Sequence, residues 1–356
     1  MAGARTYLDH NATAPLRPES RAAMIAALDI TGNPSSVHGE GRAAKAVVER
    51  ARVQVAEGIG CKPDEVIFTS GATEAASVLA HMPDVFVHPT AHDALWAHDA
   101  TAGQPVGTGR VYAMGLANSE TGIVTPPPEK EDGLWPVNVD AIAELLLLDI
   151  TQAVGRLPFA FGWSGADMAV LAAHKIGGPK GVGALIVREG LDIPPIAIGG
   201  GQEMSRRSGT ENVAAIAGFG AAIAASQVDL AAGRWAPVEK LRNILESALE
   251  AAAPETKFFG QESERLPNTS CFALPGWKGE TQVMAMDLAG YAISAGSACS
   301  SGKVRPSRVL RAMGADEETA RSAIRVSLGP ETTEAEVMGF AEAWIRQYQR
   351  WRQRAA

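Results

Sequence analysis

Short apolar runs recur along the first two thirds of the chain, and each is followed by a turn of small residues. The runs are EVIFT from Glu65, DVFVHP from Asp84, GRVYAMG from Gly109 and LLLLD ending at Asp149. Apolar runs of this length between turn residues indicate buried strands. Residues 18–29 and 40–58 instead show helical spacing, and Gly58 and Gly60 provide a stop. Alternating strands and helices predict an α/β fold, with a mostly parallel sheet covered by helices on both faces.

The pattern changes near residues 231–237, which predicts a second, smaller α+β domain. Its expected elements are a helix, a strand, a helix and a strand over Val238–Ala252, Asn268–Leu274, Glu280–Leu288 and Ala292–Ala295. We expect residues 15–235 to form the large domain, and residues 1–14 with 236–356 to form the small one. The proline- and charge-rich residues 126–137 are predicted to form a surface loop.

The composition restricts the class of protein. The chain has 356 residues and is 46% apolar, so it can bury a large core. Its net charge of −8 is not gathered into runs of either sign, which argues against a nucleic-acid partner. Three cysteines without metal-binding spacing suggest a reducing compartment and no metal site. The first residues, MAGARTYLDHNATAP, lack an apolar core of the kind found in leader sequences, and we expect no apolar segment to approach the ~20 residues of a membrane span. We therefore expect a cytoplasmic protein with no membrane partner.

An acid and an amine follow two of the predicted strands. Asp149 ends the LLLLD run, and a second apolar run ends at His174-Lys175 before a Gly/Pro turn. Lysine is the usual Schiff-base nucleophile, and enzymes that use pyridoxal 5′-phosphate (PLP) pair it with an aspartate at the pyridinium nitrogen. An arbitrary lysine at a strand end is more often a solvated residue. The neighbouring motifs therefore decide between the two interpretations.

Three further segments offer groups for a phosphate or a flat ring, and each also has an ordinary explanation. The turn Ser70–Thr73 could hold a phosphate with its N–H groups and the Thr73 hydroxyl, or could be a simple helix cap. His92 could stack on a ring and Gln152 could bond to a ring oxygen, or both could be solvated. The glycine-rich residues 199–212 could wrap an anion, or could be a flexible connection with arginines facing water.

Cys299 and Arg325 are candidates for substrate chemistry. Cys299 lies among glycines and serines in SAGSACSSG, a composition unsuited to a core, so a reactive thiol is credible. Most free cysteines are instead buried small hydrophobes, and Cys61 and Cys271 have no better claim. Arg325 interrupts the apolar run AIRVSLG and needs an anionic partner. That partner could be a structural Asp or Glu, or the carboxylate of a substrate.

Taken in order, the motifs resemble those of the cysteine desulfurases, which belong to the class V group of PLP-dependent enzymes with the fold-type-I aminotransferase fold. The resemblance runs from Tyr7 to about Thr332. The short cysteine segment is similar to the branch that supplies iron–sulfur assembly. The motifs that carry the resemblance are LDHNATAP, FTSGATEA, HPTAHDAL, ANSETG, DITQAVG, HKIGGPKGVGAL, GGGQE, RSGTEN, SAGSACSSG and AIRVSLG.

The resemblance implies a function and a set of roles. The enzyme would convert L-cysteine to L-alanine and pass the sulfur through a persulfide on Cys299 to an iron–sulfur scaffold or another sulfur carrier. Lys175 would hold the PLP aldehyde, with His92 stacked on the ring. The remaining cofactor contacts would come from Ala72, Thr73, Ser119, Asp149, Gln152, His174 and, across a homodimer interface, Thr210. Arg325 would bind the substrate carboxylate, and Asn11 would border the substrate.

Two departures from the family pattern leave alternatives open. Ser119 stands where the family usually has an asparagine, and Ala172-Ala173 replace a small hydroxyl residue and a glycine. Each lost neutral hydrogen bond would cost on the order of 0.5–1.5 kcal/mol of PLP binding. The segment from His92 to Asn118 is also short for the family. The alternatives are an aminotransferase or a selenocysteine lyase of the same fold, and a non-catalytic paralogue.

Overall fold

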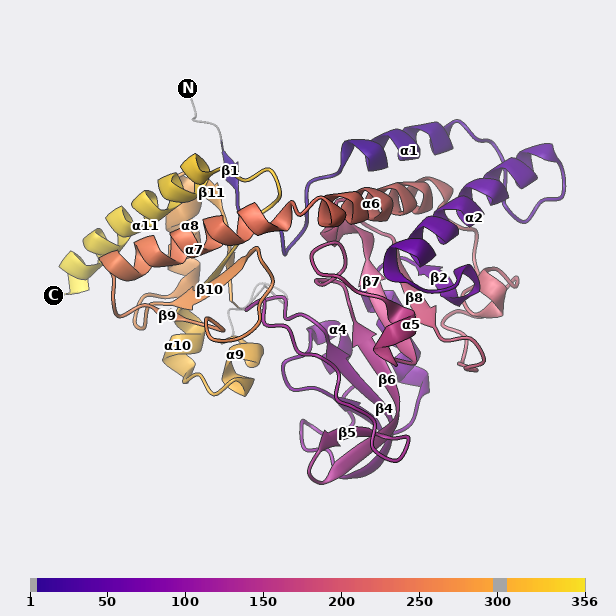
Figure 1. Cartoon of the computed structure of the whole chain (residues 1–356), viewed down its shortest axis with the longest axis horizontal. Helices are drawn as coiled ribbons and strands as arrows, with labels where there is room; N and C mark the ends of the chain where they lie inside the picture. The colour runs from indigo at the N-terminus through magenta and orange to yellow at the C-terminus, as the bar shows by residue number, and fades with distance from the viewer. Residues whose placement is uncertain (1–4, 297–305, 356) are drawn as a thin grey trace. The chain divides into compact units, whose positions relative to one another are not determined.

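The computed structural model describes residues 5–296 and 306–355 and divides the chain into two compact units (Figure 1). Unit 1 combines Met1–Ala12, Asn118–Val124 and Gly233–Ala356, and unit 2 combines Thr13–Ala117 with Thr125–Ala232. The segment Asn118–Val124 joins unit 1 through backbone hydrogen bonds from Val124 to Glu264 and from Leu266 to Gly122. The domain boundaries at residues 15 and 235 stay a prediction.

Unit 2 is built on a seven-stranded sheet in the order β2-β8-β7-β6-β4-β3, with β5 paired to the start of β6. Neighbours β3–β4, β4–β6 and β6–β7 are parallel, whereas β8 is antiparallel to both β2 and β7. The mostly parallel sheet expected from the sequence is therefore confirmed. The strands are β2 Val66–Thr69, β3 Val85–Val87, β4 Gly107–Gly115, β5 Trp135–Asn138, β6 Ala141–Asp149, β7 Met168–Ala172 and β8 Gly183–Val187.

Helices cover both faces of this sheet. On one face α2 and α6 share a core cluster with Ala169 and Leu171 of β7, and on the other α3 and α4 share a cluster with Met168 and Val170. Successive strand residues point to opposite faces, so a strand between two layers must be apolar throughout. The helices are α1 Pro18–Leu28, α2 Gly39–Ile59, α3 Ala72–Ala76, α4 Asp93–Trp96, α5 Phe161–Ser164 and α6 Val213–Ala231.

Helix α6 corrects the expectation about apolar segments. By length and composition alone it could cross a membrane, although half of its most apolar window is buried inside the protein. It packs against α1 and α2. A Cβ at Gly218 would lie 2.6 Å from Met24 Cγ of α1, and one at Gly220 would lie 2.8 Å from Ala51 Cα of α2. Its small residues therefore let two helices approach closely, as expected of a core helix.

The loop predicted for residues 126–137 is wrong at its C-terminal end. Trp135 begins β5, is almost fully buried, and donates a hydrogen bond from Nε1 to Asp167 Oδ2 at 3.2 Å. Between β4 and β6, where every residue is described, this strand stands in place of a crossover helix. Burial of the indole outweighs the loop signal of the neighbouring prolines and charges.

Unit 1 contains a four-stranded antiparallel sheet in the order β12-β13-β10-β9 and a parallel pair β1-β11. The strand predicted over Ala292–Ala295 is divided between β11 and β12. The elements are β1 Thr6–Tyr7, α7 Trp235–Ala252, β9 Lys257–Phe258, β10 Thr269–Ala273, α8 Gly279–Leu288, β11 Tyr291–Ala292, β12 Ser294–Ala295, α9 Arg308–Ala312, α10 Glu317–Ser322, β13 Ala323–Ser327 and α11 Glu334–Ala355.

An aromatic cluster holds α11 against this sheet. Trp344 is fully buried, and its ring contacts Phe272 of β10, Trp277 and Tyr348 at centroid distances of 5.5–5.7 Å. Its Nε1 donates to Gln282 Oε1 of α8 at 2.9 Å, so the one polar atom of the indole is satisfied. The cluster supports the sheet that carries Arg325.

A buried ion pair anchors the glycine-rich loop of unit 2. Arg52 of α2 donates from both terminal nitrogens to the two oxygens of Glu203, each at 2.8 Å, and both side chains are buried. The N–H of Phe68 also donates to Glu203, at 2.8 Å. Glu203, Met204 and Ser205 all have positive φ angles, of 47°, 56° and 63°. Such backbone is costly for residues other than glycine, so the ion pair holds a strained segment in place.

We therefore expect Arg52→Ala to lower the free energy of unfolding by about 3–5 kcal/mol, because Glu203 is left buried without its counter-charge. Urea denaturation of both proteins measures the difference. The matched control is Arg110→Ala, which removes an ion pair whose side chains are 42% and 46% exposed and should cost no more than about 1 kcal/mol. Equal effects of the two substitutions would contradict the anchoring role.

Candidate functional site

Two adjacent parallel strands bring the predicted acid and amine to one edge of the unit 2 sheet. Asp149 is the last residue of β6, and it lies opposite Val170 of β7. Lys175 ends the short 3₁₀ turn Ala173–Lys175 that directly follows β7. Asp149 Oδ1 accepts a hydrogen bond from the Thr151 N–H at 2.9 Å, which fixes the carboxylate at the strand end. Ligands of open α/β sheets bind beyond the carboxyl ends of the strands, which is where both side chains arise.

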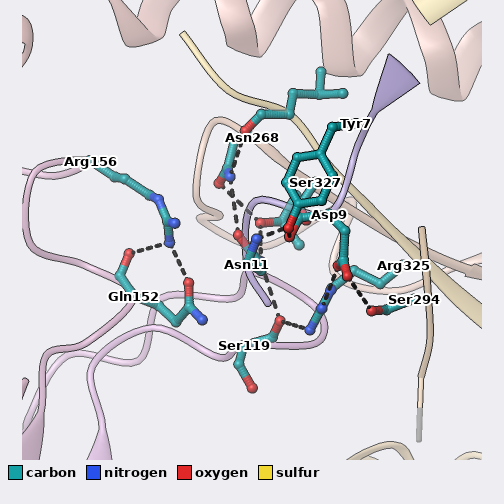
Figure 2. A network of polar contacts seen from close by, with 12 residues as sticks. Tyr7, Asp9, Asn11, Ser119, Gln152, Arg156, Asn268, Ser294, Arg325 and Ser327 are labelled. Carbon is teal, nitrogen blue, oxygen red and sulfur yellow. Dashed lines mark hydrogen bonds and ion pairs between the residues drawn. The ribbon is translucent and has the colours of Figure 1, made fainter. Parts of the chain in front are cut away.

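Arg156 holds this region together and was missed in the sequence. Its Nη1 donates to the backbone oxygen of Gln152 at 3.0 Å and to Gln152 Oε1 (Figure 2). Its Nη2 donates to the Lys175 carbonyl at 3.2 Å. Arg156 and Gln152 are both buried, so Gln152 is not the solvated loop residue that its type would suggest. The available signal was an arginine within the otherwise apolar stretch AVGRLPF.

The turn after β2 lies level with the end of β7. Thr69 pairs with Gly183 of β8, and Gly183 pairs with Ala172. A Cβ at Gly183 would lie 2.7 Å from Gly71 Cα and 2.5 Å from the Leu171 carbonyl oxygen, so only glycine lets the turn approach β8. The helix after the turn, α3, has only five residues. Anion binding at this turn would therefore depend on N–H donors and the exposed Thr73 rather than on a helix dipole.

Glu74 links this turn to the glycine-rich loop. One carboxylate oxygen accepts the Ser70 N–H at 2.6 Å, and the other pairs with Arg207 Nε at 2.7 Å. Arg207 is therefore not simply a solvated arginine. Partial burial raises the pKa of Glu74, but the hydrogen bonds from Arg207 and Ser70 together outweigh this effect, so the pKa is lowered. Thr210, three residues beyond Arg207, lies at the surface of unit 2.

The imidazole of His174 has a buried polar atom, Nδ1. Its Nδ1 makes no hydrogen bond to any described residue, whereas its backbone oxygen accepts the Ala14 N–H at 2.8 Å. Burial, together with the charges of Lys175 and Lys180, lowers the pKa of the imidazole to about 4. The ring is therefore neutral near pH 7. A buried polar atom that makes no hydrogen bond within the described residues indicates a position that can bind a ligand atom.

The two histidines of HPTAHDAL differ in their surroundings. His92 is exposed and caps α4, and its Nδ1 accepts the Ala94 N–H at 3.1 Å. His88 is turned inward, is bonded to Thr90 at 2.8 Å, and packs 6.5 Å from the ring of Tyr112. Burial lowers the pKa of His88. Of the two rings, His92 is the one whose faces are accessible for stacking.

In unit 1, Arg325 is the centre of a buried polar network (Figure 2). Its Nη2 donates to Asp9 Oδ1 and its Nη1 to the Ser119 carbonyl, both at 2.9 Å. Asn11 Nδ2 donates to the same carbonyl at 3.2 Å and to Thr269 Oγ1 at 2.9 Å. Asp9 is thus a structural anionic partner of Arg325, which was one of the alternatives that the sequence left open. Asn11 is fully buried and cross-links the network.

The predicted site residues thus fall into two groups. Unit 1 brings together Asn11, Ser119 and Arg325, and Cys299 lies outside the described residues. Unit 2 contains Ala72, Thr73, His92, Asp149, Gln152, His174, Lys175 and Thr210.

The other two cysteines are not reactive thiols. Burial raises the pKa of Cys271, and it raises that of Cys61 to about 12. Neither thiol is therefore ionised near pH 7.

Known proteins match nearly the whole chain. The aminotransferase class-V family model matches residues 6–93 and 109–340, and its gap covers most of α4, the connection to β4 and the first two residues of β4. A cysteine desulfurase from Cereibacter sphaeroides is 40% identical, covering 94% of this chain and 93% of the relative. An IscS-like cysteine desulfurase from Mycobacterium tuberculosis is 34% identical, covering 93% of each.

Solved structures agree with the sequence relatives. A NifS-like protein from Rickettsia africae superposes with a TM-score of 0.84 at 30% identity, covering 97% of this chain and 99% of that protein. Family model, relatives and fold thus coincide over the elements that carry Asp149, Lys175 and Arg325. The chain belongs to the class V aminotransferase family and, within it, to the cysteine desulfurases.

Proposed function

We propose that this protein binds PLP and converts L-cysteine to L-alanine, with transfer of the substrate sulfur to Cys299. The observation that carries the proposal is the placement of Asp149 and Lys175 at the ends of adjacent parallel strands. An acid and an amine at the carboxyl ends of adjacent strands can form the pair that a pyridine aldehyde requires. The 40% identity to a cysteine desulfurase supports the choice of reaction.

The residues of unit 2 fit the cofactor. Lys175 would hold its aldehyde, Asp149 its ring nitrogen, and His92 one face of its ring. Gln152 would approach a ring oxygen with its amide nitrogen, since Arg156 bonds to its Oε1. When bound, PLP supplies a carbonyl for the substrate amine and a ring that accepts electrons.

The phosphate would contact the Ala72–Thr73 turn and His174, whose buried Nδ1 has no partner among the described residues. Ala172 and Ala173 bring no hydroxyl group to this position. The phosphate would therefore have fewer donors than the family pattern provides, which weakens cofactor binding without preventing it.

The chemistry of the substrate then depends on three groups. Arg325 would bind the carboxylate of L-cysteine. The ε-amine of Lys175, once exchanged for the substrate amine, would remove the Cα proton. The thiolate of Cys299 would attack the substrate sulfur, forming an S–S bond as the Cβ–S bond breaks. The electron pair of the broken bond stays with carbon, where a proton completes alanine, and the sulfur remains on Cys299 as a persulfide.

Several finer features belong to the same proposal. Ser119 would stand beside the ring oxygen with a weaker contact than asparagine, and Asn11 would border the substrate. Thr210, at the surface of unit 2, would reach the phosphate of a second subunit in a homodimer. A cytoplasmic iron–sulfur scaffold or sulfur carrier would accept the persulfide sulfur.

The first test is the reaction itself. With PLP, L-cysteine and a reductant, the purified protein should release equal amounts of alanine and sulfide. Lys175→Ala should lower the rate at least about a hundredfold, because the proton acceptor is lost. Cys299→Ser should bind PLP normally and release almost no sulfide, whereas Cys61→Ser should behave like the original protein. Unchanged sulfide release from Cys299→Ser would exclude the persulfide role.

The same protein sample separates the alternative functions. Exchange of amino groups with keto acids would indicate an aminotransferase. A colourless protein that takes up no PLP would indicate a non-catalytic paralogue.

The second test restores the missing hydroxyl. Ala172 ends β7 beside Gly183 and near the Gly71 turn. Ala172→Ser should tighten PLP binding about twofold to tenfold, the factor that corresponds to one neutral hydrogen bond of about 0.5–1.5 kcal/mol. Absorbance titration of the protein freed of PLP measures the dissociation constant. Ala173→Ser, at a fully buried position, is the control and should give no gain. If Ala172→Ser bound PLP no more tightly, the phosphate contact would be misplaced.

The third test uses the lowered pKa of His174. Between about pH 6.5 and 4 the unfolded chain binds a proton at this histidine that the folded protein does not. Stability without PLP should therefore fall as the pH falls through this window. His174→Asn should lose less stability between neutral pH and about pH 5, as judged by urea midpoints. His38→Asn, at a side chain that is 60% exposed, is the control. Equal acid sensitivity of His174→Asn and the original protein would refute the assignment.

A further inference from the structure

The Asp9 side chain joins three separate segments of unit 1. Its Oδ1 accepts Arg325 Nη2 of β13 at 2.9 Å, and its Oδ2 accepts Ser294 Oγ of β12 at 2.8 Å. Asp9 follows β1 and forms a parallel bridge with Ser327. The side chains of Asp9 and Arg325 are only 16% and 7% exposed. The carboxylate is therefore fixed at both oxygens and holds one nitrogen of the guanidinium.

The Ser119 carbonyl holds a second nitrogen. It accepts Arg325 Nη1 at 2.9 Å, and Asn11 fixes it from the other side at 3.2 Å. Asn11 is itself held by Thr269 and by Asn268, whose Nδ2 donates to Asn11 Oδ1 at 3.1 Å. Two of the three guanidinium nitrogens are thus bound by groups that are themselves held in place by other hydrogen bonds.

The third nitrogen, Arg325 Nε, is buried and has no hydrogen-bond partner among the described residues. A buried donor on a charged group is costly when it is left unsatisfied. An arginine whose role was only to pair with Asp9 would gain by turning its Nε–Nη2 edge toward both carboxylate oxygens, the arrangement that carboxylates favour. In this network the second oxygen of Asp9 is bonded to Ser294 instead.

We propose that Asp9 is a positioning residue that orients Arg325, so that the Nε–H remains for the carboxylate of an amino-acid substrate. This inference rests on the proposed function. Asp9 itself would not touch the substrate. It would restrict the several rotatable bonds of the arginine side chain before binding and so reduce the ordering cost of recognition. It also balances the charge of Arg325, so the direction of the donor, rather than excess positive charge, selects the carboxylate.

The test compares two ligands that differ only in the carboxylate. The PLP-loaded protein is titrated with L-alanine and with ethylamine, and the cofactor absorbance gives the two dissociation constants without turnover. Asp9→Ala should weaken L-alanine about tenfold or more, the effect of one charge-assisted hydrogen bond, and should leave ethylamine within about twofold. Asp9→Asn, which can still accept from Nη2, should restore L-alanine to within about threefold of the original value.

Two serine variants keep the test decisive if Asp9→Ala fails to fold. Ser294→Ala removes one hydrogen bond to Asp9 and should weaken L-alanine about twofold to threefold, with ethylamine unchanged. Ser270→Ala is the matched control, because Ser270 lies in β10 of the same sheet and its buried Oγ has no hydrogen bond among the described residues. It should change neither ligand.

Two results would overturn the role of Asp9 alone. One is unchanged L-alanine binding in both Asp9→Ala and Ser294→Ala. The other is equal weakening of L-alanine and ethylamine, the result expected of a purely structural ion pair. An original protein that takes up no PLP, or whose cofactor absorbance does not respond to L-cysteine, would instead overturn the proposed function together with this inference.

Discussion

The parallel pairing of β6 with β7 is the constraint on which the proposed cofactor site depends. Leu146–Leu148 of β6 and the residues of β7 are buried between helices on two faces, so these stretches are apolar up to the strand ends. The polar residues Asp149 and Lys175 follow these buried stretches, at the carboxyl ends of the two strands. The helices on both faces, including α6 with its small residues, cover these two strands and their neighbours.

Ion pairs and hydrogen bonds of charged side chains hold the irregular segments, which lack the backbone hydrogen bonds of a sheet. In unit 2, Arg52–Glu203 and Glu74–Arg207 tie the glycine-rich loop to α2 and to the turn after β2. Arg156 connects Gln152 to the Lys175 backbone. In unit 1, the Asp9 carboxylate and the Ser119 carbonyl hold the guanidinium of Arg325. In each case a charged side chain is held at several points, so its orientation is set before any ligand arrives.

Of the two departures from the family pattern, Ala172-Ala173 falls at the proposed phosphate end of the cofactor site, and Ser119 at the proposed ring oxygen. Ala172 and Ala173 occupy the end of β7 and the turn that leads to His174, and neither has a polar side chain. In the proposed site His174 would compensate in part, because burial keeps its ring neutral and its Nδ1 has no partner among the described residues. Cofactor affinity is thus the property in which this chain should differ most from its relatives.

The sequence by itself determined the α/β class, most strands, and the candidates Asp149, Lys175 and Arg325, because periodicity and isolated charges in apolar runs are local properties. It misplaced Trp135, whose burial depends on the neighbouring β6 and Asp167. Only the tertiary structure revealed Asp9 as the partner of Arg325, 316 residues away, and Arg156 as the support of Gln152. Asp9 and Arg325 belong to segments that meet only in the folded chain, so no pattern within a single segment encodes their pairing. Arg156 is only four residues from Gln152, but its hydrogen bond to the Lys175 carbonyl depends on how the turns after β6 and β7 meet.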